Sequence, residues 1–230
     1  MAKKRIVVLT GAGISAESGI STFRDSGGLW EKYDITDVAT PEAWERNMEM
    51  VNEFYNQRRK QLYEVSPNDA HYALVELEKA YDVHIITQNV DDLHERAGSS
   101  NVMHLHGELK KVRSSVDENL VYTLDGWELK IGDLCEKGSQ LRPNVVWFGE
   151  PVPMIPAAAE LSASADIYVI IGTSLNVYPA AGLVDYASPG IPMYLIDPAQ
   201  PGVSHMPNLT IMQEKAGTGT KKLVKELMEK

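Results

Sequence analysis

A single cysteine, the lack of any long apolar run and a shortage of basic side chains restrict what this 230-residue chain can be. Cys135 has no second cysteine to pair with, so an internal disulfide is excluded and a reducing, cytoplasmic location is expected. No apolar stretch approaches the roughly 20 residues that span a bilayer, so we expect no membrane partner. The chain has 22 lysines and arginines against 32 acidic residues, a formal charge of −10, which argues against a nucleic-acid partner.

What is present is typical of a globular protein. Hydrophobic residues make up 43% of the chain and charged residues 23%. The first apolar run begins almost at once, so we expect no signal or transit peptide. The acidic balance mildly favours a cationic partner, such as a polypeptide that carries lysine, and we expect the chain to act as a monomer.

Short, continuously apolar runs rich in β-branched residues recur along the chain. Such runs are typical of parallel strands that are buried on both faces of a sheet. They cover residues 5–10, 83–88, 102–106, 166–174, 192–197 and 209–213. Helical patterns lie between several of them, which predicts an α/β fold with a Rossmann-like parallel sheet and helices on both faces.

Two helices can be placed in more detail. In the first, Ser66 is the expected N-cap and Pro67 the first helical residue. In the second, at the C-terminal end, the pattern "KKLVKELMEK" is amphipathic. The apolar residues expected to face the core are Ala70, Ala73, Leu74 and Leu77 in the first helix and Leu223, Val224 and Leu227 in the second.

Two segments interrupt this alternation of strands and helices. Residues 26–66 are helical without strands, and residues 108–143 are turn-rich with short strands. Both are inserted between sheet strands, so they predict a smaller, discontinuous domain. The larger, Rossmann-like domain would then comprise residues 1–25, 67–107 and 144–230.

Four polar stretches follow four of the apolar runs, where open α/β sheets bind ligands. The first, Gly11-Ala12-Gly13, would let backbone N–H groups approach a pyrophosphate, although the same glycines also suit a tight turn. A dehydrogenase would continue into a helix and a second strand, but here the loop-like "SGISTFRDSGGLW" follows. Nucleotide binding therefore remains possible, whereas hydride transfer is not indicated.

The second and third stretches are "TQNVDDLHERAG" and "MHLHGE". Gln88, Asn89 and Asp91 could hold a carboxamide or ribose hydroxyls, although a capped helix start explains them equally well. His104 and His106 fall on one face of their strand by alternation. His106, which a glycine follows, is the better candidate for a general base.

The fourth stretch, "IIGTSLNVYP", ends a very apolar run with Gly172, Thr173 and Ser174. Small hydroxyl residues at that position suit contacts to phosphate or ribose. Each signal is modest alone, but all four would meet at one edge of the sheet.

Taken together and in order, "GAGISAESGISTFRDSGGLW", "TQNVDDLH", "LHGE", "RPNVVWFGE" and "GTSLNVYPA" strongly resemble the sirtuins, which are NAD-dependent protein lysine deacylases. The resemblance runs from residue 5 to about residue 220. It implies that NAD is consumed as a co-substrate: the acyl-lysine carbonyl oxygen attacks the ribose carbon that bears nicotinamide, and a histidine then deprotonates a ribose hydroxyl. The implied partners are acylated lysines of proteins, and the implied products are nicotinamide, O-acyl-ADP-ribose and free lysine.

The resemblance also assigns roles to residues. The catalytic ones are His106, as the base, and Asn89, whereas His104 is taken as structural. The residues matched to NAD binding are Gly11, Ala12, Gly13, Phe23, Arg24, Gln88, Asn89, Asp91, Gly172, Thr173, Ser174, Asp197 and Ala216. The residues matched to the segment that pairs edge-on with the substrate backbone are Val146, Phe148, Gly149 and Glu150.

One helical stretch, "NEFYNQRRKQL", narrows the substrate. Tyr55 and Arg58 lie three residues apart on one helix face and match the Tyr-x-x-Arg pair by which some sirtuins bind acidic acyl groups such as succinyl or malonyl. An Arg fork binds a carboxylate bidentately, and a phenol adds a third donor. Without the family pattern, the same spacing would indicate a solvated helix face. We also expect acetyl groups to be removed.

The departures from the family pattern carry equal weight. Sirtuins commonly hold a structural zinc with two pairs of cysteines, but Ser114 and Ser115 stand where the first cysteine is expected and only Cys135 remains. We therefore expect no zinc, with Cys135 as a leftover of the site. Segment 108–143 would instead be held by its apolar residues Val121, Tyr122, Leu124, Trp127, Leu129 and Ile131.

A smaller departure concerns the adenosine. Leu195 and Asp197 stand where an Asn-x-Glu-like contact is often found, whereas Ala216 matches the small residue beside adenine.

Two other functions use the same residues. A protein mono-ADP-ribosyltransferase would share the NAD site, but it needs no acyl pocket such as Tyr55 and Arg58. A non-catalytic NAD-binding protein would not need His106, Asn89 and Arg24 intact. Production of O-acyl-ADP-ribose distinguishes a deacylase from both.

Overall fold

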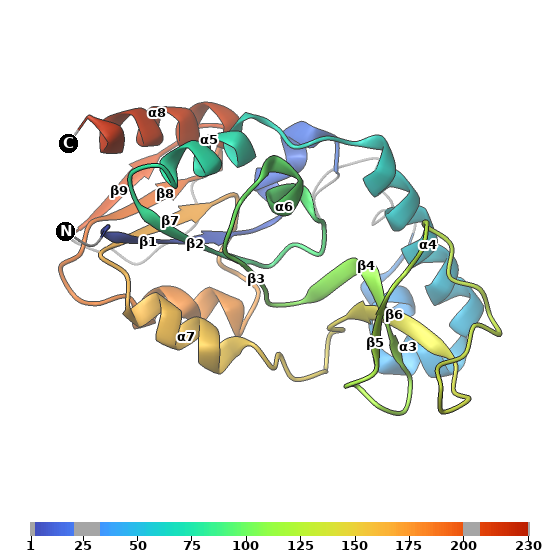
Figure 1. Ribbon diagram of the computed structural model, residues 1–230. Helices are drawn as coiled ribbons and strands as arrows, with labels where there is room; N and C mark the ends of the chain where they lie inside the picture. The colour runs from blue at the N-terminus through green and yellow to red at the C-terminus, as the bar shows by residue number, and fades with distance from the viewer. Residues whose placement is uncertain (1–2, 21–32, 200–207, 230) are drawn as a thin grey trace.

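A six-stranded parallel sheet forms the larger part of the computed structural model, which describes residues 3–20, 33–199 and 208–229 (Figure 1). Its order is β3-β2-β1-β7-β8-β9, and every neighbouring pair is parallel. The strands are β1 (Arg5–Thr10), β2 (Asp82–Thr87), β3 (Val102–His104), β7 (Ile167–Ile171), β8 (Met193–Ile196) and β9 (Leu209–Met212). The chain winds outward from β1 in both directions, so the switch point between β1 and β7 is the expected ligand crevice. The predicted Rossmann-like α/β fold is confirmed.

Alternate residues of the strands pack against two layers of helices. Ile6 and Val8 of β1 face α5 (Asp69–Leu77) and α8 (Ala216–Met228), whereas Val7 and Leu9 face α7 (Ile155–Ala163) and the 3₁₀ helix η3 (Ala180–Tyr186). In Figure 1, α5 and α8 cover one face of the sheet and α7 the other. The residues predicted to point inward from α5 and α8 are all buried.

The predicted start of α5 is wrong by two residues. Asn68, not Ser66, is the N-cap: its side chain accepts a hydrogen bond from the amide of Ala70, and His71 completes a capping box. The Asn68 amide group also donates to the carbonyl of Ile14. This contact to the loop after β1 is tertiary, so the local pattern could not favour Asn68 over Ser66.

The described part of the smaller domain joins three helices to an antiparallel sheet, at the right of Figure 1. The helices are α2 (Ile35–Val38), α3 (Pro41–Arg46) and α4 (Met48–Glu64). The sheet has the order β5-β4-β6, with β4 (Gly107–Ser114), β5 (Val121–Thr123) and β6 (Leu141–Val145). These strands lie close to the boundaries predicted at residues 108 and 143. Val51, Phe54, Tyr55, Trp44 and Trp147 pack in a third apolar cluster between helices and sheet.

The expected apolar core of segment 108–143 is wrong. Only Leu129 of the six predicted residues is buried, and Val121, Trp127 and Ile131 are 42%, 37% and 47% exposed. The segment is held by side chains of α4 that bind its main chain. Asn56 pairs with both the N–H and the C=O of Leu129, at 2.9 Å each.

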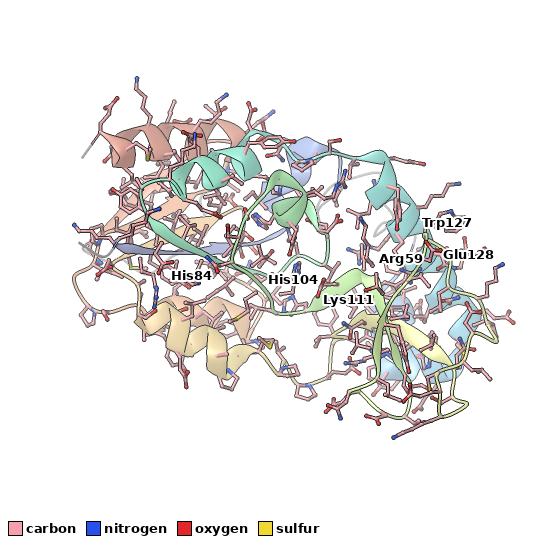
Figure 2. The ribbon with its side chains drawn as sticks, in the orientation of Figure 1. Arg59, His84, His104, Lys111, Trp127 and Glu128 are labelled. Atoms are coloured by element: carbon pink, nitrogen blue, oxygen red, sulfur yellow. The ribbon has the colours of Figure 1, made fainter. Side chains whose placement is uncertain are left out.

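Two further side chains of α4 complete this polar attachment. The fully buried Arg59 donates to the carbonyl of Trp127 at 2.7 Å and to the side chain of Asn56 at 2.6 Å, and Figure 2 shows Arg59 and Trp127 together in this domain. Asn52 donates to the carbonyl of Leu129. Main-chain groups can be bonded by a helix wherever the fold brings them, so apolar composition did not reveal this attachment.

Cys135 belongs to a small hydrogen-bonded cluster. Its Sγ lies 3.4 Å from Oγ of Ser114 and 3.0 Å from Oγ of Ser139, and the two hydroxyls are 2.9 Å apart. These hydrogen bonds lower the pKa of Cys135 to about 7. Ser114 and Cys135, which stand at positions matched to the zinc cysteines, are therefore neighbours without a full ligand set. In the described ranges, no cluster of three or more His, Cys, Asp or Glu side chains could hold a metal ion.

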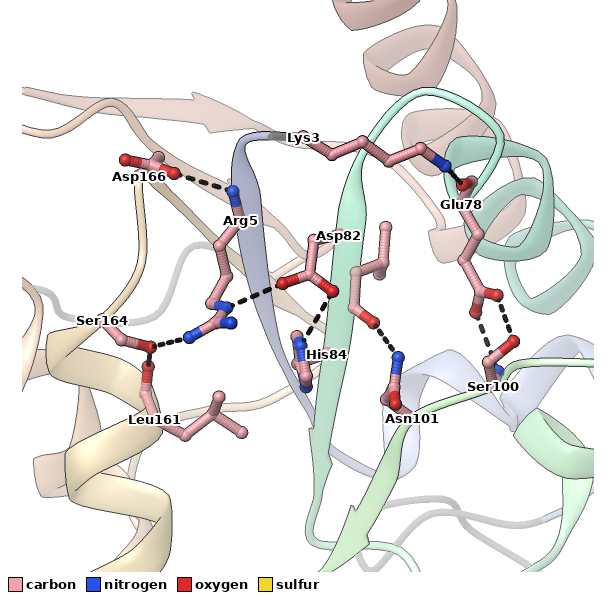
Figure 3. Close-up of polar contacts among 11 residues, drawn as sticks. Lys3, Arg5, Glu78, Asp82, His84, Ser100, Asn101, Leu161, Ser164 and Asp166 are labelled. Atoms are coloured by element: carbon pink, nitrogen blue, oxygen red, sulfur yellow. Dashed lines mark hydrogen bonds and ion pairs between the residues drawn. The ribbon is translucent and has the colours of Figure 1, made fainter. Parts of the chain in front are cut away.

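Ionic contacts tie together the strands at the end of the sheet opposite the predicted site (Figure 3). Arg5 binds Asp82 at 2.9 Å, and its amide donates to the carboxylate of Asp166. Asp82 also accepts from His84 at 3.0 Å. These contacts link β1, β2 and β7 at their starts and leave their carboxyl ends for the site. Within the part of the chain that the structure describes, no helix is both long and apolar enough to cross a bilayer.

Candidate active site

The loops that follow β1 and β7 touch each other at three glycines. The amide of Gly13 donates to the carbonyl of Gly172 at 2.8 Å. A Cβ on Gly11 would lie 2.8 Å from that carbonyl oxygen, and one on Gly13 would lie 2.7 Å from the Cα of Gly172. Gly172 has φ of +62°, which favours glycine. The Gly-Ala-Gly sequence is thus required by the approach of two loops at the switch point.

This packing also determines which amides of the loop after β1 are already hydrogen-bonded. The amides of Gly11 and Gly13 bond to Ile171 and Gly172, whereas the amide of Ala12 donates to none of the described residues. A pyrophosphate could therefore take a hydrogen bond from Ala12 without breaking one to any of the described residues.

Strand β2 delivers Gln88, Asn89 and Asp91 to the same edge. The side chain of Asn89 donates to Oγ of Ser15 at 3.1 Å, and Ser15 in turn donates to Asp91 at 3.0 Å. Gln88 donates to Oγ1 of Thr173 at 3.1 Å, across the β1/β7 switch point. The predicted residues of three strands are therefore brought together, and Ser15, which sequence reasoning missed, links two of them.

Asp91 is 5% exposed. Burial raises the pKa of its carboxyl, while hydrogen bonds from the Leu93 amide and Ser15 oppose that change. One carboxylate oxygen is used by each of these donors, which fixes the plane of the group. It is a buried, oriented acceptor of the kind that binds ribose hydroxyls.

Among the described residues, His106 has a hydrogen-bond partner at one ring nitrogen, Nδ1. Its Nδ1 lies 2.9 Å from the carbonyl oxygen of Gln88, which can only accept, so Nδ1 carries the proton and Nε2 has the free lone pair. Burial lowers the pKa of His106, and the bond to Gln88 opposes this in part. A neutral imidazole with an open Nε2 is what a general base requires.

His104 has a different environment from His106. Its Nδ1 donates to the carbonyl of Asn89 at 3.1 Å, and its Nε2 lies 2.7 Å from the carboxylate of Glu95. Burial lowers the pKa of His104, but the hydrogen bond to Glu95 and its charge outweigh burial and raise it above the ordinary value. His104 therefore holds the carbonyl of Asn89, next to the carbonyl that holds His106, which agrees with a structural role.

The remaining NAD candidates lie at the same edge or outside the described residues. Ser174 follows Thr173 in the loop after β7, and Asp197 directly follows β8. Ala216 is buried at the first turn of α8. Leu195 is fully buried within β8, so only Asp197 of that pair stands beyond the strand. Phe23 and Arg24 lie outside the described residues.

On α4, Tyr55 and Arg58 lie next to each other. The Arg58 guanidinium carbon is 5.8 Å from the Tyr55 ring centroid. Burial raises the pKa of Tyr55, so its hydroxyl stays protonated, and burial lowers the pKa of Arg58, against the opposing effects of Tyr55 and Asp91. A phenol and a partly buried cation thus share one face of the helix.

The segment after β6 is anchored by its own acidic residue. The carboxylate of Glu150 accepts from Arg142 at 2.7 and 3.1 Å, from Arg113 at 3.1 and 3.3 Å, and from the amide of Trp147 at 2.8 Å. Burial raises the pKa of Glu150, but the hydrogen bonds from Arg142 and the Trp147 amide and the two arginine charges outweigh burial and hold the pKa below its ordinary value. The predicted contact of Glu150 to substrate stays a prediction, but its side chain is used inside the protein. Phe148, by contrast, is 45% exposed.

Two histidines absent from the sequence predictions lie buried behind the site. His94 is 3.2 Å from Oγ1 of Thr10, and its ring meets that of His71 edge-on at 4.9 Å. Burial lowers the pKa of His71 to about 4 and that of His94 well below its ordinary value. Both are neutral packing residues near neutral pH. Only their positions on the buried faces of α5 and α6 (Leu93–Ala97) could have signalled this.

These residues fit NAD. Amides, a buried carboxylate and hydroxyls lie together at the switch point, among them the amide of Ala12, which has no partner among the described residues. Such groups suit a pyrophosphate, ribose hydroxyls and a carboxamide. The roles of Gln88, Asn89, Asp91 and Thr173 in holding the cofactor stay predictions, which these contacts support.

Comparisons with known proteins identify the family of this chain. Residues 11–179 match the model of the Sir2 family. A protein of Helicobacter pylori (strain ATCC 700392 / 26695) named NAD-dependent protein deacylase is 56% identical over 229 residues, covering 98% of both chains. One of the same name from Bacteroides thetaiotaomicron is 54% identical, covering 96% of both.

Solved structures give the same result. A Sir2 homologue in complex with NAD superposes with a TM-score of 0.89 at 39% identity, covering 99% of this chain and 90% of that one. A mutant Sir2 homologue with ADP-ribose has a TM-score of 0.90 at 40% identity, covering 99% and 93%.

Proposed function

Because the chain belongs to the Sir2 family and is an NAD-dependent protein deacylase, we propose that it removes succinyl and malonyl groups from protein lysines and acetyl groups as well. The observation that carries the acyl preference is the pairing of Tyr55 and Arg58 on α4. The Arg58 guanidinium lies beside the Tyr55 ring, and the charge of Asp91 acts on its pKa.

The electrostatics of this pair favour an acid group. A carboxylate at the end of the acyl chain would meet a cation that has already lost part of its hydration, so the cost of burying the cation is not paid again on binding. An Arg fork and a phenol together supply three donors to the two oxygens. An acetyl group has no carboxylate and would gain nothing from either residue.

The residues around the cofactor would have two different roles in the reaction, proton abstraction and positioning of the cofactor. When bound, NAD supplies a ribose carbon from which nicotinamide leaves and a ribose hydroxyl that must lose a proton. His106 offers Nε2 as the base, with its ring fixed by the Gln88 carbonyl. Asn89 and Asp91, linked through Ser15, are oriented to hold polar groups of the ribose or the carboxamide.

The substrate backbone would pair with the segment that follows β6. Val146 donates its amide to the carbonyl of His106, which places this segment directly against the residue assigned as base. Phe148 and Gly149 follow at the surface. An extended peptide added to this edge would bring its lysine toward His106.

We further propose that the chain acts as a monomer in the cytoplasm. Its single cysteine supports a reducing compartment. The NAD-binding domain is proposed to comprise residues 1–25, 67–107 and 144–230, with 26–66 and 108–143 forming the smaller domain. The presence of two separate sheets supports this division.

The experiment is NAD-dependent turnover of matched acetyl-lysine and succinyl-lysine peptides, with O-acyl-ADP-ribose measured by mass spectrometry. We expect Arg58→Met to raise KM for the succinyl peptide by roughly ten- to a hundredfold, the loss of a charged hydrogen bond of roughly 1.5–3 kcal/mol. The acetyl peptide should be affected far less. The matched control is Lys60→Met, which removes an exposed cation two residues further along α4. Equal effects of Arg58→Met on both peptides would remove Arg58 from the acyl pocket.

A further inference from the structure

We propose that Trp147 is a positioning residue for acidic acyl groups: its indole N–H holds the Tyr55 hydroxyl so that the phenol can only donate its proton toward the substrate carboxylate. The inference rests on the acyl pocket proposed above and adds to it a residue from a different element. Trp147 lies between Val146 and Phe148, which the sequence assigns to the substrate segment, and it was not predicted to have a role.

The argument begins with the chemistry of one hydrogen bond. Nε1 of Trp147 lies 3.0 Å from Oη of Tyr55. An indole N–H can donate but never accept, so the phenol oxygen must be the acceptor. The hydroxyl proton of Tyr55 is then directed away from Trp147. Without the indole, this hydroxyl could rotate and present either its proton or its lone pairs to a ligand.

Burial makes this restriction effective. Tyr55 is 1% exposed and Trp147 2% exposed, so water does not compete freely for either group. Burial also raises the pKa of Tyr55, which keeps the hydroxyl protonated and able to donate. A lone pair of a neutral phenol would repel a carboxylate, whereas its proton attracts one. Fixing the direction of the proton therefore favours acidic acyl groups over neutral ones.

Trp147 is itself held firmly in place. The guanidinium carbon of Arg142 lies 3.3 Å from the ring centroid of Trp147, and Glu150 binds Arg142 through both carboxylate oxygens. Glu150 also accepts from the Trp147 amide. The face of the indole thus contacts Arg142, the main-chain amide of Trp147 donates to Glu150, and the indole N–H donates to Tyr55. A residue that only filled space in the core would need the ring but none of these polar contacts.

This arrangement connects the acyl pocket with the substrate segment. Tyr55 lies on α4, and Trp147 is 92 residues further along the chain, in the segment that would pair with the substrate backbone. A movement of that segment when peptide binds would therefore change the position of the Tyr55 hydroxyl. The pair of Trp147 and Tyr55 would thus couple binding of the peptide to binding of the acyl chain.

Trp147→Phe tests the inference because it keeps an aromatic ring beneath Arg142 and removes the N–H. We expect the ratio of kcat/KM for succinyl to that for acetyl peptide to fall roughly fivefold, the value of one buried hydrogen bond. The loss should appear mainly in KM for the succinyl peptide. The matched control is Trp44→Phe, whose ring packs on Trp147 at 5.7 Å and which should leave the ratio unchanged.

A double-mutant cycle isolates the pair. In a Tyr55→Phe background, which lacks the hydroxyl, Trp147→Phe should cause no further change in the ratio. The indole proton resonance of Trp147 should also shift upfield in Tyr55→Phe, which reports the bond without any substrate. Additive effects of the two substitutions, or an unshifted resonance, would overturn the inference.

The outcomes separate this inference from the function on which it rests. Succinyl turnover that depends on Arg58 but not on Trp147 overturns the role of Trp147 alone. No succinyl turnover by the unaltered protein overturns both. A succinyl-to-acetyl ratio that falls in Trp147→Phe and not in Trp44→Phe supports both.

Discussion

Nδ1 of His106 lies 2.9 Å from the main-chain carbonyl oxygen of Gln88, and this one contact decides which ring nitrogen can act. The carbonyl can only accept, so the proton stays on Nδ1 and the lone pair on Nε2. Because Gln88 also donates to Thr173, the base is tied to the cofactor crevice through a single residue.

The pH dependence of turnover should reflect this base. Burial lowers the pKa of His106, and only the deprotonated form can accept a proton, so activity must fall as the pH drops through that pKa. We expect the acidic limb of kcat/KM, which reports the free enzyme, at an apparent pKa below the ordinary histidine value of about 6.5. A limb above 6.5 would contradict the assignment.

The variant His106→Ala tests directly whether His106 is the base. Deacylation should fall by about 10²–10⁴-fold, the usual contribution of a general base. NAD should still bind, as calorimetry can measure, because Gln88, Asn89 and Asp91 keep their partners. Undiminished turnover would rule out His106 as the base.

The contact between the loops after β1 and β7 predicts that Gly172→Ala is poorly tolerated. A Cβ at Gly172 would overlap the backbone of Gly13 and Ile14, in addition to the strain of a positive φ. Gly138→Ala separates the two effects, since Gly138 has φ of +75° but no atom within 4 Å of the added Cβ.

We expect Gly138→Ala to lower the free energy of unfolding by about 1–2 kcal/mol and Gly172→Ala to lower it further. Only Gly172→Ala should also weaken NAD binding. Denaturant titration and calorimetry measure the two quantities. Similar losses in both variants would show that the close approach of the two loops makes no separate contribution to the free energy of unfolding.

The attachment of segment 108–143 to α4 predicts stability without metal. Asn56→Ala leaves the buried N–H of Leu129 without its partner and removes one of the two acceptors that Arg59 has among the described residues. We expect a loss of about 2–4 kcal/mol, with faster hydrogen exchange across residues 125–143. Gln57→Ala, next to it on α4 and bonded only to Glu53 in the described contacts, should change stability by less than about 0.5 kcal/mol.

A chelator should leave the Tm of the unaltered protein and of the Asn56→Ala variant unchanged. A fall in Tm with EDTA, or zinc found by elemental analysis, would contradict the absence of zinc expected from the single cysteine.

The buried pair of His71 and His94 predicts sensitivity to acid. Burial lowers the pKa of His71 to about 4, so the unfolded chain, with an ordinary value of about 6.5, binds more protons between these two values. Stability is therefore complete above pH 6.5 and is lost as the pH falls toward 4. For His71 alone this amounts to about 3 kcal/mol, and His94 acts in the same direction.

The variant His71→Gln keeps a hydrogen-bond acceptor for the Asn68 amide, as in an ordinary capping box, but does not titrate. Its free energy of unfolding, measured by urea titration at several pH values, should depend on pH by about one proton less between pH 4 and 6.5. An unchanged slope would mean that His71 is not the titrating group.

Much of the fold could be predicted because its signals are local. Mainly apolar runs identified β1, β2, β7, β8 and β9 to within a few residues. The inner strands β1, β7 and β8 are buried on both faces and are therefore almost entirely apolar, whereas β9, with Thr210 and Ile211 exposed, was identified by its β-branched residues. The polar stretches at their carboxyl ends were placed correctly at one edge, because parallel strands must end together. The failures concern contacts between distant segments, such as the cap of α5 by Asn68 and the attachment of segment 108–143.

By itself, the sequence determined the class of fold, and it predicted the edge of the sheet for ligand binding and the histidine for the role of base. Periodicity and strand polarity are properties of short stretches, so one chain suffices to read them. Only the tertiary structure decided the proton on Nδ1 of His106, the closeness of Gly13 to Gly172, and the bond from Trp147 to Tyr55. Each of these joins segments far apart along the chain, and a hydrogen bond depends on distances of a few tenths of an ångström that packing alone sets.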